Sequence, residues 1–145
     1  MDFFSSLDVS ASGMAAERTR MNLISSNIAN ANSTRSKEGG PYKRKDAVFA
    51  AVSANTGANN PFNRNGLMNI KKVAVTEIKE DQSAPRMQYD PTHPDADANG
   101  QVAMPNVNVV EEMVDMVSAS RAYEANVTAA QAAKSMAMKT LDLLR

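Results

Sequence analysis

Apolar residues recur at helical spacing near both ends of the chain, over residues 3–28 and again over residues 110–144. The spacing of the first stretch is the i, i+3 or i+4 pattern of an amphipathic helix. This helix is expected to end near the Asn- and Ser-rich residues 30–33, because Gly and Pro at residues 39–41 forbid its continuation. Its apolar face is made of Leu7, Ala11, Met14, Met21, Ile24 and Ile28.

The second stretch carries a heptad pattern sustained over more than four heptads, which is typical of a coiled-coil type helix. Eight of the ten residues in its two heptad lines are apolar. The pattern therefore predicts a long C-terminal helix that packs on another helix. The two lines are Met113, Ser120, Val127, Lys134 and Leu141, and Met116, Tyr123, Ala130, Ala137 and Leu144.

A further line of small apolar residues lies one residue away on the same predicted helix. One residue corresponds to a rotation of about 100°, so the helix has two adjacent apolar faces. A helix with two such faces needs at least two partners, and small residues on one of them would allow a close approach. The second partner must be the middle of the chain or another molecule. We call this line the alanine stripe: Ala122, Ala125, Ala129, Ala132 and Met136.

The middle of the chain, residues 35–104, holds most of the Gly and Pro residues. Between these breakers the alternation of side chains predicts short strands over residues 42–53, 67–80 and 86–89, the last paired with residues 101–104. Residues 56–65 are too polar and too rich in breakers to pack well. The predicted fold is mainly α: two long, antiparallel terminal helices that form one coiled-coil-like domain (residues 1–34 and 105–145), with a small β-rich or irregular module (residues 35–104) at its far end.

An alignment of the two helices follows if Phe4, near the start of the chain, lies level with Leu144, near its end. Equal rise per residue then makes the numbers of paired residues add up to roughly 148. This register places Met21 beside Val127 and Glu17 within about one turn of Lys134. It also lets residues 106–117 overrun the first helix and pack on the middle module. Because isolated helices of this kind are marginal in water, we also expect the two ends of a free chain to be poorly ordered.

Composition and charge exclude several classes of function and of binding site. The 16 basic and 16 acidic residues balance, so no global field favours nucleic acid or an anionic membrane. The chain has no Cys, which excludes a disulfide, a thiolate zinc site and a thiol nucleophile. Ten Met residues with 5% aromatic residues suit thin helix–helix contacts. No run approaches the roughly 20 apolar residues of a membrane span. The first 20 residues lack the basic and apolar regions of a cleaved secretory signal.

Three segments of the middle module resemble chemical sites. Residues 95–100 start like an EF-hand loop, but the twelfth position holds Asn106 instead of a bidentate carboxylate, so a turn between two strands is the better interpretation. His93 is the only histidine and is expected to be hydrogen-bonded in a loop. The basic residues 43–45 are interpreted as a solvated surface. We expect no enzyme activity, no cofactor and no metal site.

Two motifs resemble a known family. Ser26-Asn27-Ile28-Ala29-Asn30 resembles the signature shared by flagellar rod and hook proteins, with Ser26 in place of the usual first Asn. Residues 89–113, residues 120–126 and the closing residues 139–144 are similar to the proximal rod proteins of the bacterial flagellar basal body, the FlgC family. The resemblance covers both ends and much of the middle, but not residues 54–66.

This resemblance implies a structural subunit of the rod, the drive shaft that crosses the periplasm. Members of the family leave the cell through the flagellar type III export apparatus without a cleaved signal, and they pair their terminal helices into an inner domain. The implied partners are other rod subunits, copies of the chain, neighbouring basal-body components and the export apparatus. No nucleic acid or small-molecule substrate is implied. The residues expected at assembly contacts are Leu7, Met14, Met21, Ile24, Asn27, Ile28, Asn30, Met113, Met116, Tyr123, Ala125, Val127, Ala129, Leu141 and Leu144.

Asn27 and Asn30 lie three residues apart, and so on one side of the last helical turn. We expect at least one of the two amides to be buried against a neighbouring element, while simple capping of the helix is the alternative. Two alternative functions stay open from the residues alone. A calcium-binding module would use Asp95 to Asn99, and a soluble coiled-coil adaptor would bind one partner through its last helix.

Overall fold

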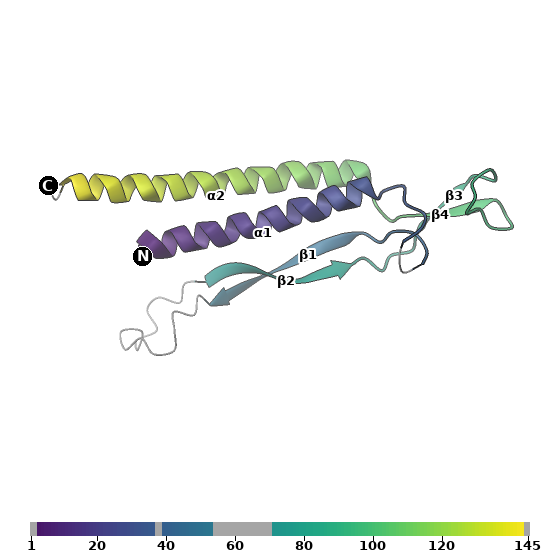
Figure 1. Ribbon diagram of the computed structural model, residues 1–145, viewed down its shortest axis with the longest axis horizontal. Helices are drawn as coiled ribbons and strands as arrows, with labels where there is room; N and C mark the ends of the chain where they lie inside the picture. Colours follow the sequence, from purple (N-terminus) through teal and green to yellow (C-terminus); the bar gives the residue numbers. More distant parts are fainter. Residues whose placement is uncertain (1–2, 37–38, 54–70, 144–145) are drawn as a thin grey trace.

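A computed structural model describes residues 3–36, 39–53 and 71–143 (Figure 1). The predicted helices are present at both ends of the chain, and four strands lie between them. The predicted pairing of residues 86–89 with residues 101–104 is confirmed, whereas the predicted loop over residues 56–65 lies outside the described residues. The elements are α1 (Phe3–Ala29), β1 (Lys45–Ser53), β2 (Lys71–Glu80), β3 (Arg86–Tyr89), β4 (Gln101–Met104) and α2 (Val109–Leu143).

The two helices lie side by side and run in opposite directions, with the antiparallel pair β1–β2 on the other side of α1 (Figure 1). Helix α1 is therefore the middle layer, since it packs on α2 and on both strands, while α2 packs on no strand in the described part of the chain. The expectation that the middle module sits at the far end of the hairpin is wrong for β1 and β2. Within the described residues both strands pack along α1 and on no other helix.

Polar contacts fix the β1–β2 ribbon to α1. The ammonium of Lys72 lies 2.7 Å from a carboxylate oxygen of Asp8, and the backbone N–H of Val73 donates to Oγ of Ser12 at 3.2 Å. A register shift between Val48 and Phe49 bends β1, as a bulge does in a two-stranded ribbon. Because these contacts involve the first half of α1, the ribbon extends back towards the N-terminus.

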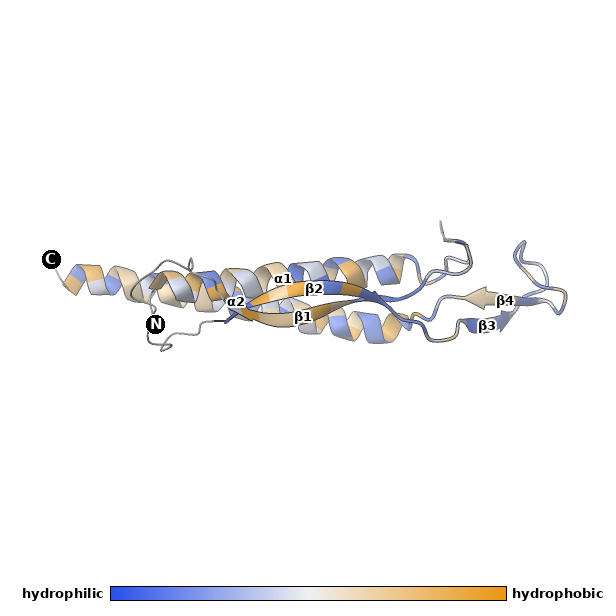
Figure 2. Cartoon of the chain, turned by 90° about the horizontal axis from the view of Figure 1, so that it is seen from below, coloured by the Kyte–Doolittle hydropathy of each residue, from blue (hydrophilic) through white to orange (hydrophobic). Residues whose placement is uncertain are grey.

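The β3–β4 hairpin projects beyond the ends of both helices, as seen from below in Figure 2. Its strands are joined by the segment that resembles an EF-hand loop, and this segment forms a turn, as predicted. Oδ1 of Asp97 accepts hydrogen bonds from the backbone N–H groups of Asn99 and Gln101. Gly100 adopts a φ of +73°, which favours glycine because it has no Cβ.

The buried core is thin and made of small side chains, which fits the low aromatic content. Among the described residues none of the helices is long and apolar enough to cross a membrane. The buried apolar residues line the contact of α1 with its neighbours and the base of the hairpin: Ala16, Ile24, Ala31, Val102, Val107, Ala119 and Ala133.

Candidate assembly surfaces and the polar junction

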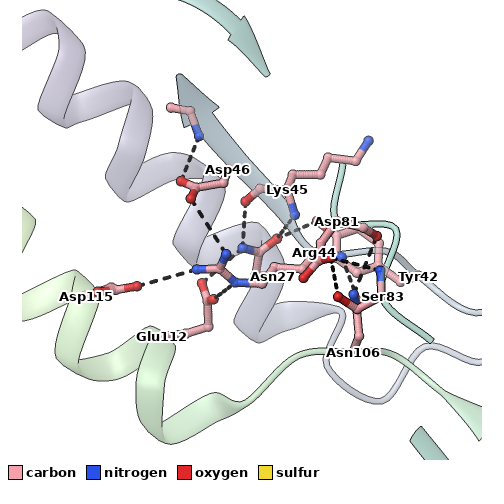
Figure 3. A network of polar contacts seen from close by, with 11 residues as sticks. Asn27, Tyr42, Arg44, Lys45, Asp46, Asp81, Ser83, Asn106, Glu112 and Asp115 are labelled. Carbon is pink, nitrogen blue, oxygen red and sulfur yellow. Dashed lines mark hydrogen bonds and ion pairs between the residues drawn. The ribbon is translucent and has the colours of Figure 1, made fainter. Parts of the chain in front are cut away.

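A buried polar junction joins the C-terminal end of α1 to the starts of β1 and α2 (Figure 3). Asn27 lies at its centre and is fully buried. Its Nδ2 donates to the backbone oxygen of Lys45 at 2.9 Å and to Oε2 of Glu112 at 3.0 Å. Its Oδ1 accepts from the N–H of Lys45 at 3.0 Å and from the hydroxyl of Tyr42 at 2.9 Å. Both donor hydrogens and both lone pairs of the amide are therefore used.

The junction also holds an ion pair between Arg44 and Glu112. Nε of Arg44 lies 2.6 Å from Oε1 of Glu112, and the side chain of Glu112 is only 1% exposed. Asp115 and Asp46 lie farther from the guanidinium, at 3.5 and 3.7 Å. Burial by itself would lower the pKa of Arg44, but the hydrogen bond and the charge of Glu112 outweigh it and raise this pKa. The guanidinium of Arg44 therefore stays charged in this half-buried position.

The prediction that residues 43–45 form a solvated surface is wrong for Arg44, whose side chain is only 27% exposed. Sequence analysis also missed Glu112. Both residues look solvated in the sequence because their partners lie far away along the chain. A signal for Glu112 existed, since it lies seven residues before Ala119 and fourteen before Asn126, and so on the same helix face.

The linker before α2 is held at the same junction. Oδ1 of Asn106 accepts from the backbone N–H of Arg44 at 3.0 Å, and the N–H of Asp81 donates to the backbone oxygen of Arg44 at 2.8 Å. Hydrogen bonds from the side chain and backbone of Ser83 lower the pKa of Asp81. Because Asn106 follows β4 and Asp81 follows β2, their two hydrogen bonds to Arg44 bring the ends of β2 and β4 to the start of β1.

Asp95 ties the β3–β4 hairpin to the segment after α1. It accepts from Oγ1 of Thr34 at 2.8 Å and from Nε of Arg35 at 2.6 Å. The hydrogen bond from Thr34, followed by that from Arg35, lowers the pKa of Asp95. His93 is hydrogen-bonded in the loop, as predicted, since its Nδ1 accepts from the N–H of Asp95 at 3.1 Å. Within the described ranges no three His, Asp or Glu residues are grouped to hold a metal ion.

Two contacts fix the register of the helix pair. A Cβ added to Gly13 would lie 2.9 Å from Oδ1 of Asn126, and Asn27 bonds Glu112. The residue numbers add up to 139 in both contacts. The predicted sum of 148 is therefore wrong by nine residues, or about 13 Å of helix. The prediction aligned the chain ends, whereas the actual register depends on a buried polar pair and on a glycine, neither of which an apolar pattern records.

The new register changes the other pairs as well. Met21 is level with Ser118 instead of Val127, and Glu17 is level with Ala122, far from Lys134. One carboxylate oxygen of Glu17 is buried without a hydrogen-bond partner in the described chain.

The end of α2 that overruns is also the opposite of the one predicted. Phe3 is level with residue 136, so residues 136–143 extend past the described start of α1 (Figure 1). We call this segment the overhang. Its large apolar side chains are all more than half exposed: Met136 64%, Met138 56%, Leu141 64% and Leu143 87%.

Comparisons with known proteins match both helices. The family model described as flagella basal body rod protein matches residues 7–35. The model described as flagellar basal body rod FlgEFG protein C-terminal matches residues 98–143. A flagellar basal-body rod protein FlgC of Borreliella burgdorferi is 45% identical over 100% of this chain and 99% of its own length. That of Bacillus subtilis is 45% identical over 99% of both chains, and that of Salmonella typhimurium 42% identical over 94% of this chain and 93% of its own.

The chain belongs to the FlgC family of flagellar basal-body rod proteins. It is therefore a structural rod subunit of the basal body and not an enzyme. The polar junction connects the two matched regions of the chain. Asn27 lies in the region of the first family model and Glu112 in that of the second. Their hydrogen bond joins the two regions that identify the family.

The structure places the residues expected at assembly contacts in three groups. In α1, Ile24 and Asn27 are buried, while Leu7, Met14, Met21 and Ile28 are half-buried. In α2, Met116, Tyr123 and Val127 are half-buried, whereas Met113, Ala125, Ala129 and Leu141 are exposed. Leu144 lies outside the described residues. The most buried line of α2 is instead Glu112, Ala119 and Ala133.

The two amides near the end of α1 have different roles. Asn27 confirms the expectation of a buried amide that bonds a neighbouring element, and that element belongs to the same chain. Asn30 instead caps the helix, because its Nδ2 donates to the backbone oxygen of Ser26 at 2.9 Å and its Oδ1 accepts from the hydroxyl of Ser33 at 3.2 Å.

Proposed function

We propose that this rod subunit assembles through α2, whose faces away from α1 bind helices of neighbouring rod subunits. In this proposal α1 and α2 act as one antiparallel, coiled-coil-like pair inside the rod. The observation that carries it is the exposure of most of the alanine stripe. Ala125, Ala129, Ala132 and Met136 are exposed on a helix whose other face already packs on α1.

Small side chains on this stripe suit a close helix neighbour. The alanines let two helix axes approach closely, and the flexible methionine fills an irregular gap at the contact. No other described element of the chain is placed to cover the stripe, since β1 and β2 lie on the far side of α1 (Figure 1). The partner that fits is therefore a helix of another subunit.

The proposed partners are other rod subunits and further copies of the chain, with neighbouring basal-body components at the ends of the rod. We also place the chain in the periplasmic part of the basal body and propose that it arrives through the flagellar type III export apparatus without a cleaved signal. Membership of the FlgC family and its rod relatives supports this placement. Mass spectrometry of the chain in isolated basal bodies tests it, since a mass smaller than that of the whole chain would contradict export without cleavage.

An added charge on the alanine stripe tests the assembly surface. Ala129→Glu would place an unpaired carboxylate against a close helix neighbour, which is costly, so we expect the chain to be absent from isolated basal bodies and the cells to lose swimming. Gln131→Glu is the matched control, because it adds the same charge on the opposite side of the same helical turn, where Gln131 is exposed. Normal incorporation and swimming with Ala129→Glu would mean that the stripe faces solvent in the rod.

A further inference from the structure

A second apolar stripe lies near the start of α2, and no other described element covers it. Its four residues follow the i, i+3, i+4, i+7 spacing of one helix face. Val114 and Val117 are rotated by about 200° and 140° from the buried Glu112, so the stripe points away from α1. We call it the valine stripe: Val110 (63% exposed), Met113 (50%), Val114 (64%) and Val117 (53%).

The charges beside the valine stripe have one sign. Residues 109–118 of α2 contain three acidic residues and no basic one. Glu112 and Asp115 are balanced by Arg44, whereas Glu111 is exposed and has no ion pair among the described residues. A ligand of this face would therefore combine an apolar surface with a positive charge.

The overhang of this chain is a helix end that combines apolar side chains with nearby positive charges. It spans seven residue steps, as the valine stripe does, so the two surfaces have the same length of about 10 Å. Met138 and Leu141 share one face, and Lys134 and Lys139 provide two positive charges near them against one acidic residue, Asp142. Because its apolar side chains point in several directions, the overhang needs cover from a neighbour.

We propose that the valine stripe binds the C-terminal helix end of the next rod subunit, an apolar end with flanking lysines like the overhang of this chain. This inference rests on the proposed function and assigns the two surfaces of one contact. The contact is head-to-tail, because a subunit uses its valine stripe for one neighbour and its overhang for another. Such a contact repeats along an open assembly and does not close on itself as a two-fold dimer does.

A crosslink from cysteine to lysine tests the contact in assembled basal bodies. The chain has no cysteine, so Met113→Cys creates a single reactive thiol at the centre of the stripe. A short thiol-to-amine crosslinker should join it to a lysine in the last helical turns of a rod subunit, identified by mass spectrometry. Asn22→Cys, at an exposed position of α1, is the control and should not yield this peptide. A crosslink from position 113 to a strand region, to a protein outside the rod, or to nothing would overturn the proposal.

Two substitutions separate failure of this inference from failure of the proposed function. Met113→Glu and Glu111→Lys should each reduce incorporation into basal bodies at least tenfold, while circular dichroism of the purified chain stays unchanged because both side chains are exposed. If both variants assemble and swim normally while Ala129→Glu does not, the inference fails and the proposed function stands. If all three variants assemble normally, both fail.

Discussion

Nε of Arg44 lies 2.6 Å from Oε1 of Glu112, which is one of the most buried side chains of the molecule. This pair joins the start of β1 to the first turn of α2. Asn27 bonds the other oxygen of the same carboxylate, so three segments far apart in the sequence depend on one side chain.

Removal of the Glu112 carboxylate should therefore destabilise the chain strongly. Glu112→Ala removes the nearest carboxylate from the half-buried guanidinium of Arg44 and one acceptor from the amide of Asn27, and we expect a loss of about 3 kcal/mol in the free energy of unfolding. Urea unfolding of the purified chain measures it, and a cooperative transition would itself contradict the expectation that the two ends of the free chain are poorly ordered. Glu111→Ala, at the exposed neighbouring position, should change the value by no more than about 0.5 kcal/mol. Equal effects of the two substitutions would mean that the junction does not stabilise the fold.

Asn27→Ala should have a similar consequence from the other side of the junction. It removes the amide that bonds the backbone of Lys45, the hydroxyl of Tyr42 and one oxygen of Glu112, which costs about 2–3 kcal/mol. The expected result is a lower cellular level of the chain together with lost rod assembly. Asn22→Ala, at an exposed position of the same helix, is the control. A normal cellular level with assembly lost would assign Asn27 to a contact between subunits.

The close approach of Gly13 and Asn126 should couple the two positions. A Cβ at position 13 would lie 2.9 Å from the amide oxygen of Asn126, whose Nδ2 already donates to the backbone oxygen of Ala122. Gly13→Val should destabilise the chain by about 1–3 kcal/mol through overpacking, and adding Asn126→Ala should recover most of that loss. A double-mutant cycle in urea measures the coupling. Strictly additive effects would contradict the register found here.

The attachment of the β3–β4 hairpin should weaken in acid. The pKa of Asp95 is lowered from its ordinary value of 3.8, so its ionised form favours the folded state. This contribution is complete above pH 3.8 and is lost as the pH falls through the lower pKa of the folded state. Protection of the backbone amides over residues 86–104, taken relative to their intrinsic exchange rate at each pH, should therefore decrease below about pH 4.

Asp95→Asn provides the control for this acid effect. It should exchange faster at neutral pH and show a weaker response to acid. Part of the response should remain, because the pKa of Asp90 is lowered too, by hydrogen bonds from Thr92. An unchanged acid response in this variant would exclude Asp95 as the group that titrates.

The overhang should matter for assembly and not for the stability of the single chain. Leu141→Glu changes a side chain that is 64% exposed and has no partner in α1, so the free energy of unfolding should stay within about 0.5 kcal/mol of its original value. The same substitution should remove the chain from isolated basal bodies. A large loss of stability in the purified chain would mean that the overhang packs on its own subunit.

The sequence predicted those features that depend on local patterns. Helical spacing of apolar residues located α1 and α2, and the alternation of side chains between the Gly and Pro breakers located β3 and β4. The register of the helices could not be predicted in this way, because it depends on Asn27 with Glu112 and on Gly13 with Asn126. The place of the β1–β2 ribbon was missed for a similar reason, since its contacts with α1 include the hydroxyl of Ser12 and the backbone of Val73, and neither leaves a periodic signal.

The order of the layers makes the two flanks of a single subunit different from each other. The ribbon shields one flank of α1, and α2 lies on the opposite flank with its outer faces bare (Figure 1). In the proposed assembly the two flanks meet different neighbours, because one presents bare helix and the other a two-stranded ribbon. The helices of successive subunits would then gather on the same side of a row, and the ribbons would line the other side.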